Sequence, residues 1–156
     1  MKKLILLLNE LETKFQFKDI KDLSVSQSAV SWHIDHTIKV LLVVIDAMKN
    51  VDSSKHKKKF NFIKHIIFTI GSIPRGKAKA PKSVQSFDEI TLDSLKNQLE
   101  QARFHVSLWN HLSVRSNFNH PYFGVLNLKE SEKFLIIHTQ HHLKIINEIV
   151  KKNTTN

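Results

Sequence analysis

Cysteine is absent from the 156-residue chain, and glycine and proline occur only three times each. The lack of cysteine excludes disulfides, a cysteine nucleophile, and zinc or iron–sulfur sites held by thiolates. The glycines, Gly71, Gly76 and Gly124, are spaced to fit neither a GxGxxG motif nor a Walker A phosphate loop. The sequence therefore disfavours the classical dinucleotide-binding and P-loop folds.

Long apolar runs are also missing. Residues 4–8 are apolar, but the run stops at Asn9, short of the roughly 7–15 residues of a signal-peptide core. Residues 40–45 form the longest other run, far below the roughly 20 residues of a membrane span. We therefore expect a cytoplasmic protein with no membrane partner, in which residues 4–8 begin an amphipathic helix.

Apolar residues make up 41% of the chain, enough for a hydrophobic core without cross-links, and the length suggests one domain over residues 1–156. Their spacing is helical almost throughout, with no sustained strand alternation. Long helices are predicted at about 26–51, 58–70, 87–112 and 128–152. The predicted fold is all-α, a four-helix bundle with an additional short N-terminal helix.

Helix boundaries are indicated by capping residues. Gly71, followed by Pro74, predicts the end of the second long helix. A helix start is indicated where an N-cap residue precedes a glutamate or glutamine by three positions. The chain has three such pairs in front of long helices: Ser24 with Gln27, Ser86 with Glu89, and Asn127 with Glu130.

Histidine is abundant, with ten in the chain. On a helical wheel of the last helix, His138 and His142 fall inside the apolar arc and His141 falls on its rim. The i, i+4 spacing of His138 and His142 places both imidazoles on one face, as in HExxH zinc sites. The glutamate of that motif is absent, because Thr139 follows His138.

A third ligand is available from the first long helix. His36 lies in line with Val40 and Val43 on the apolar face, and His33, about 60° away, also points inward. In a bundle, either residue can reach the pair on the last helix. Three neutral imidazoles and a water would form an open site for zinc, nickel or iron(II). The alternative interpretation is that these histidines are buried for structural reasons.

The order and separation of these motifs resemble one family. Trp32-His33-x-x-His36 on an early helix, followed by His138-x-x-x-His142 on the last, resembles the DinB-like superfamily of YfiT-related, bacterial, metal-binding four-helix proteins. An HPxFG loop before an HxxHH helix, at residues 120–124 and 138–142, is similar to one branch of it. The resemblance covers about residues 24–150. It implies metal ligands at His36, His138 and His142, with His33 as a rival for the first position.

Two reactions follow from such a site. A bound divalent ion could activate water for hydrolysis of a small amide or ester. The resemblance implies instead a low-molecular-weight thiol cofactor and a thiol-dependent transfer to a small-molecule substrate. No carboxylate occupies an obvious general-base position, so the catalytic residues stay unassigned. Candidates for proton transfer or for the pocket wall are His33, His141, His120, Tyr122 and Trp32.

Positive charge is concentrated in one stretch. The formal net charge is +10, and between Asp52 and Asp88 the chain carries nine basic residues and no acidic one. Such a stretch is typical of a solvated basic face, but it also fits anion binding by Arg75, Lys77 and Lys79. The alternative function is thus a non-catalytic basic helical module that binds nucleic acid or another polyanion. Helical bundles readily pair exposed apolar faces, so a homodimer is a further expectation.

Overall fold

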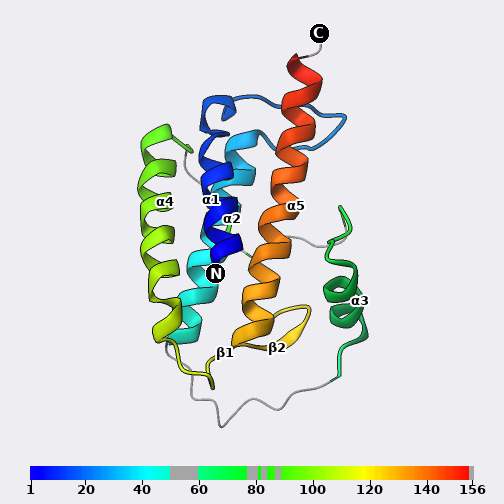
Figure 1. Ribbon diagram of the computed structural model, residues 1–156. Coiled ribbons are helices and arrows are strands. Elements are labelled where there is room, and N and C mark those ends of the chain that lie inside the picture. Colours follow the sequence, from blue (N-terminus) through cyan, green and yellow to red (C-terminus); the bar gives the residue numbers. More distant parts are fainter. Residues whose placement is uncertain (50–59, 77–80, 82–83, 87–88, 155–156) are drawn as a thin grey trace.

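The computed structural model describes residues 1–49, 60–76, 81, 84–86 and 89–154. In that part of the chain the protein is mostly helical, with one small two-stranded sheet (Figure 1). None of the described helices is both long enough and apolar enough to cross a membrane. The helices are α1 (Lys2–Glu12), α2 (Val30–Lys49), α3 (Phe62–Ile70), α4 (Leu92–Ser107) and α5 (Leu128–Thr154). The strands are β1 (Asn117–His120) and β2 (Gly124–Asn127).

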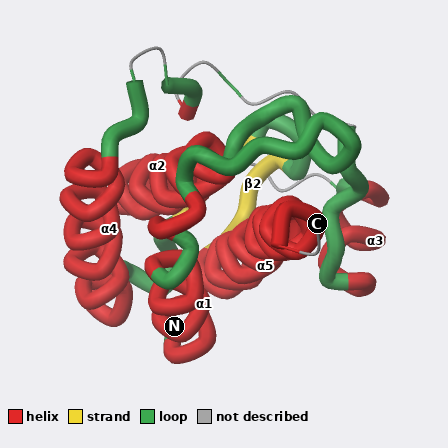
Figure 2. The backbone as a smooth tube through the Cα atoms, turned by 90° about the horizontal axis from the view of Figure 1, so that it is seen from above, coloured by secondary structure: helices red, strands yellow, loops and turns green. Residues whose placement is uncertain are grey.

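Four helices pack together around the core. α2 contacts both α4 and α5, and α1 contacts the same two helices. Seen from above, α1, α2, α4 and α5 surround a common interior, while α3 lies on the outer side of α5 (Figure 2). The interior is filled by leucine and isoleucine side chains from all four helices. Burial of these apolar faces is the main contribution to the stability of such an arrangement.

The N-terminal helix has a different place from the predicted one. The sequence predicted an additional short helix there, beside four long ones. Instead α1 is one of the four packed helices, because Leu4, Leu7, Leu8 and Leu11 follow the i, i+3, i+4, i+7 pattern and are all buried. The additional helix is α3, which has one buried residue, Ile67, and packs against α5.

Three predicted helix starts are wrong. α2 begins at Val30 rather than near residue 26, and Ser24 binds the side chain of Asp22 instead of capping a helix. α4 begins at Leu92 rather than near residue 87, and its N-cap is Thr91, whose side chain accepts a hydrogen bond from the Ser94 N–H. Its helical end is also earlier, because residues 108–111 form a 3-10 turn. α3 begins at Phe62 rather than near residue 58, and its N-cap is Asn61, whose side chain accepts a hydrogen bond from the Lys64 N–H at 2.8 Å. The predicted helix end near residue 51 lies outside the described residues.

The start of α5 and the end of α3 agree with the prediction. The Asn127 side chain accepts from the Glu130 N–H at 2.9 Å, and the Glu130 carboxylate accepts from the Asn127 N–H at the same distance. This reciprocal pair is a capping box. α3 ends at Gly71, which adopts the left-handed conformation with φ of 70°.

Residues 117–127 form a hairpin where no strand was predicted. β1 and β2 pair antiparallel, with His120 opposite Gly124 and Asn117 opposite Asn127. Each strand has only four residues, too few for an alternation to stand out in the sequence. The predicted turn at 121–124 is present, and Gly124 supplies the positive φ of 67° that a three-residue hairpin loop needs.

Candidate metal centre

Three histidines from two helices meet in the interior. His36 on α2 and His138 and His142 on α5 each offer one ring nitrogen, and these nitrogens lie within 4.8 Å of one another. All three side chains are buried. The i, i+4 spacing on α5 puts His138 and His142 one above the other, and the packing of α2 against α5 brings His36 to them. Among the described residues this is the group that can hold a metal ion.

His33 contacts the cluster from outside. Its Nδ1 lies 3.0 Å from Nδ1 of His142, and its Nε2 lies 2.9 Å from Oγ of Ser26. Both nitrogens of His33 are therefore occupied by protein partners. Because Nδ1 of His142 is also occupied, Nε2 is the nitrogen that His142 can offer to an ion. His33 is thus an orienting neighbour of His142. The sequence had offered His33 and His36 as alternatives for the third ligand position, and the structure places His36 in the three-histidine group.

His36 is held by a backbone carbonyl. Its Nδ1 lies 3.2 Å from the carbonyl oxygen of Val84. A carbonyl only accepts, so Nδ1 carries the proton and Nε2 carries the lone pair. Metal-binding histidines are typically oriented in this way, with the second ring nitrogen donating to a carbonyl or carboxylate. The indole of Trp32 stacks on the ring of His36, with centroids 4.8 Å apart and planes 7° from parallel.

A buried carboxylate fixes the segment that carries Val84. Asp35 is 2% exposed and accepts hydrogen bonds from Ser86 Oγ and, at 3.0 Å, from Gln98 Nε2. Lys39 Nζ lies 3.1 Å from the same carboxylate. Residues 84–86 are therefore tied to α2 beside the cluster, and through Val84 they orient His36. No sequence pattern indicates this contact, because it involves a backbone group.

Burial keeps the clustered imidazoles neutral. Desolvation lowers the pKa of His138 and of His142 well below the usual value, and nearby histidines lower both further. Desolvation, with a smaller effect of His36, also lowers the pKa of His33 to about 4. The pKa of His36 is lowered by desolvation too, although Val84 and Asp35 oppose that shift. Neutral imidazoles at pH 7 have the lone pairs that metal binding requires.

The remaining predicted pocket residues are spread over the surroundings. His141 is half-buried on the rim, where burial lowers its pKa and a hydrogen bond to the Ile73 backbone opposes the shift. His120 lies in the hairpin, where its ring stacks on Phe123 at 4.3 Å between centroids. The Tyr122 side chain is exposed at the hairpin turn. The structure brings Trp32 and His141 to the cluster, and it leaves Tyr122 away from it.

The donor set of three imidazole nitrogens could hold a metal ion. With metal–nitrogen bonds of about 2.0 Å, tetrahedral geometry holds the nitrogens roughly 3.4 Å apart, somewhat closer together than the limit of 4.8 Å observed here. His138 is 9% exposed, and its neighbours in the cluster are the rings of His36 and His142, with centroids 5.2 and 4.6 Å away. Its ring can therefore supply a nitrogen to an ion shared with those two histidines.

The predicted anion-binding residues lie largely outside the described part. Lys77 and Lys79 are in that category, and the Arg75 guanidinium pairs with Glu148 at 2.7 Å.

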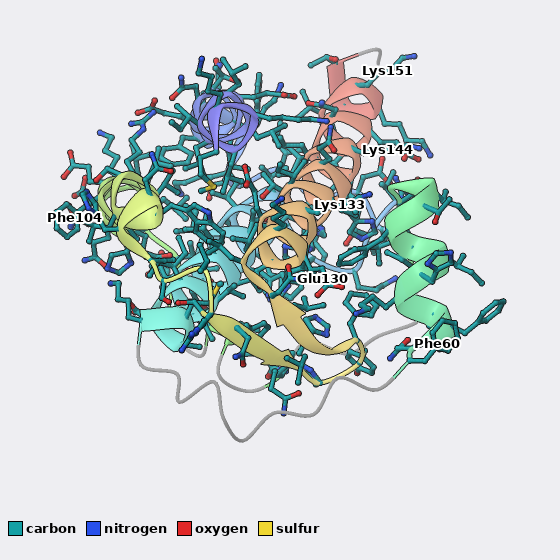
Figure 3. The ribbon with its side chains drawn as sticks, turned by 60° about the horizontal axis from the view of Figure 1, so that its bottom comes forward. Phe60, Phe104, Glu130, Lys133, Lys144 and Lys151 are labelled. Carbon is teal, nitrogen blue, oxygen red and sulfur yellow. The ribbon has the colours of Figure 1, made fainter. Side chains whose placement is uncertain are left out.

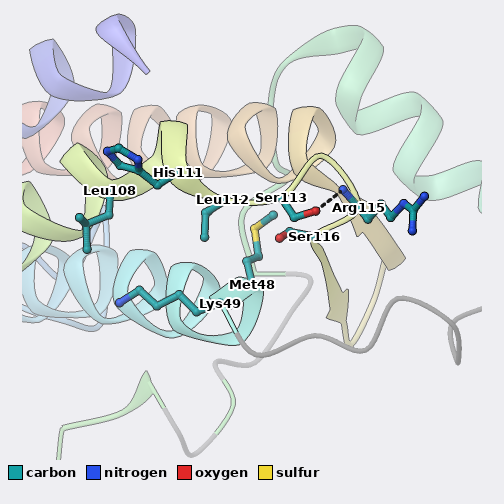
Figure 4. Close-up of a pocket in the computed structure, with 8 residues that line it drawn as sticks. All are labelled: Met48, Lys49, Leu108, His111, Leu112, Ser113, Arg115 and Ser116. Atoms are coloured by element: carbon teal, nitrogen blue, oxygen red, sulfur yellow. Dashed lines mark hydrogen bonds between the residues drawn. The ribbon is translucent and has the colours of Figure 1, made fainter.

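A separate cavity of about 520 Å³ lies far along α2 from the histidines, between Met48, Lys49 and the 3-10 turn after α4 (Figure 4). Its lining includes His111 and Arg115 but none of the clustered histidines.

Comparison with known proteins gives no assignment: no family model, no curated protein and no solved structure matches the chain.

Proposed function

We propose that the protein is a metal-dependent enzyme, a thiol-dependent transferase or a small-molecule hydrolase, on a four-helix bundle of the DinB-like kind. The observation that supports it is the convergence of His36, His138 and His142, with the ring orientations of His36 and His142 set by other protein groups. Burying three imidazoles without a partner for their lone pairs is costly. A metal ion held by their nitrogens accounts for the arrangement.

The charge of the donor set favours an anionic fourth ligand. Three neutral imidazoles leave the double charge of an ion uncompensated, and the Asp35 carboxylate is already occupied by Ser86, Gln98 and Lys39. When bound, the ion would lower the pKa of a water or of an external thiol, so that hydroxide or thiolate forms near neutral pH. Trp32 and the rim residue His141 would border the space where the substrate meets that group.

His142 is oriented by residues that are not themselves candidate ligands. Metal binding by His142 requires that its Nδ1–H donates to Nδ1 of His33 and that the His33 Nε2–H in turn donates to Ser26 Oγ, across contacts of 3.0 and 2.9 Å. This proton arrangement leaves the lone pair of His142 on Nε2, directed away from His33. The opposite arrangement would place a proton on Nε2 of His142 and block metal binding there. Through this contact His33 can hold His142 in the tautomer that the site needs.

Metal content of the purified protein tests the proposal. We expect about one equivalent of zinc, nickel or iron, measured by mass spectrometry, and loss of that metal in His36→Ala, His138→Ala and His142→Ala. His33→Ala should keep the site and weaken its metal affinity by roughly 10–100-fold, as removal of an orienting partner does.

His65→Ala is the matched control, because His65 is exposed on α3 and should leave metal content unchanged. Circular dichroism of each variant separates loss of ligands from loss of folding. Wild-type protein that binds no metal after incubation with these ions would refute the proposal. Full retention of metal by the folded His36→Ala variant would refute the ligand assignment.

A further inference from the structure

The outer face of α3 carries large apolar side chains in contact with solvent. Phe62, Ile63 and Ile70 are 65%, 61% and 69% exposed, and Ile66 lies between them. Phe60, just before the helix, is 85% exposed and points away from the body of the molecule (Figure 3). We call these five residues the outer face of α3. A contiguous exposed patch of this kind marks an interaction site.

The opposite side of the same helix is already packed. Ile67 is buried, and the Phe68 ring meets Phe123 of the hairpin with centroids 5.9 Å apart. Lys64 Nζ bonds the Glu130 carboxylate at 2.9 Å. α3 is thus anchored to the rest of the molecule by its inner side. The helix therefore has two apolar sides: the inner side packs against the molecule, and the outer face is exposed to solvent.

The sequence around the outer face of α3 is basic. α3 contains no acidic residue. It lies within the stretch from Asp52 to Asp88, which has nine basic residues and no acidic one in the sequence. Of these nine, Lys64 and Arg75 belong to the described residues, where each is ion-paired. The neighbouring helix α5 carries Lys133, Lys144 and Lys151 along its length (Figure 3). Of the carboxylates of α5, Glu130 and Glu148 are paired, with Lys64 and Arg75.

We propose that the outer face of α3 docks on an anionic lipid surface. Phenylalanine and isoleucine side chains would enter the boundary between headgroups and acyl chains, and lysines of the basic stretch and of α5 would contact acidic headgroups. Docking of this kind needs no helix that spans the membrane, so it is compatible with the finding that no described helix can cross one. The proposal is independent of the metal centre.

The charge decides between this surface and other occupants. In a symmetric pair of copies, each outer face would meet the same face of its partner, which would bring two basic stretches together. Nucleic acid is attracted by the lysines, but isoleucine offers neither a ring for base stacking nor a hydrogen bond. An anionic bilayer satisfies both the apolar side chains and the positive charge.

Vesicle co-sedimentation of the full chain tests the proposal. We expect binding to vesicles of phosphatidylcholine mixed with phosphatidylserine, weakened by salt and much weaker on phosphatidylcholine alone. Phe62→Ser with Ile63→Ser should lower the affinity by about tenfold or more, because two apolar side chains no longer enter the lipid. The matched control is Leu6→Ser with Phe104→Ser, which removes side chains of similar exposure, 67% and 61%, from α1 and α4.

A direct readout is tryptophan fluorescence of Phe62→Trp, whose emission should shift to the blue when anionic vesicles are added, whereas that of Phe104→Trp should not. Equal vesicle binding by the two serine variants would overturn the proposal. So would a monomer–dimer equilibrium or an RNA affinity that the Phe62→Ser, Ile63→Ser variant loses while lipid binding persists, since the face would then serve a second copy or a nucleic acid.

Discussion

His120 is an imidazole that the hairpin encloses. Its Nδ1 accepts hydrogen bonds from the backbone N–H groups of Tyr122 and Phe123 at 3.1 and 3.2 Å. Its ring lies against Phe123 and, edge to face, against Phe134. Burial lowers the pKa of His120 from 6.5 to about 4. The residue therefore stays neutral in the folded protein at pH values where it is protonated in the unfolded chain.

This difference predicts acid sensitivity. Below pH 6.5 the unfolded state binds a proton that folded His120 takes up only near pH 4, so the free energy of unfolding falls as pH falls through this window. The loss from His120 amounts to about 3 kcal/mol. His120→Asn, which keeps an acceptor for the turn, should reduce the pH slope between these values by up to about 1.4 kcal/mol per pH unit.

Urea unfolding of both proteins at several pH values between 4 and 7 measures that slope. His65→Asn, a change at an exposed histidine, is the control and should leave the slope unchanged. An unaltered slope in His120→Asn would contradict the prediction.

Helical periodicity in the sequence was enough to predict which histidines of the candidate site point into the interior. His36, His138 and His142 share their helix faces with apolar residues, and that alone places them inside. Periodicity could not predict which of His33 and His36 is the candidate ligand and which is the orienting neighbour, because both point inward. It depends on Ser26 and on the carbonyl of Val84. Contacts of a loop residue and of a backbone group leave no periodic pattern.

At the scale of elements, the start of α5 depends on its capping box. Asn127→Ala removes the acceptor for the Glu130 N–H, and we expect it to lower the free energy of unfolding by about 1 kcal/mol. Asn127→Ser should retain most of the stability, because serine also accepts at this position. Thermal unfolding of the three proteins makes the comparison. Equal destabilisation by alanine and serine would show that Asn127 acts through the hairpin instead.

It was easier to predict from the sequence that a helix forms than to predict which elements it packs against. The leucine pattern of α1 and the apolar residues of α3 both indicate helices, but neither says against what they pack. α3 is apolar on two sides, so its sequence resembled that of a core helix more than α1 did. The hairpin was missed for another reason. Its four-residue strands are stabilised by contacts with α2 and α5, which no local pattern records.

For the whole molecule, the position of α1 predicts a large effect of a small change. Leu8 is fully buried among the packed helices, and Leu8→Ala should lower the free energy of unfolding by roughly 2–5 kcal/mol. Leu6→Ala, two residues away and exposed, should change it by less than about 0.5 kcal/mol. Chemical denaturation measures both. Similar small effects of the two substitutions would mean that α1 is peripheral after all.

The two helices that supply the clustered histidines lie far apart in the sequence, with about a hundred residues between His36 and His138. Closing so long a loop has a high entropic cost in the unfolded chain. The three nitrogens therefore meet only when α2 and α5 have packed together. An ion that binds them would bind the native state and not the unfolded chain, and so would stabilise the native state. By mass action, an ion present at a hundred times its dissociation constant would shift the folding equilibrium by about 2.7 kcal/mol. The supply of metal in its surroundings would then set part of the stability of the protein, before any reaction takes place.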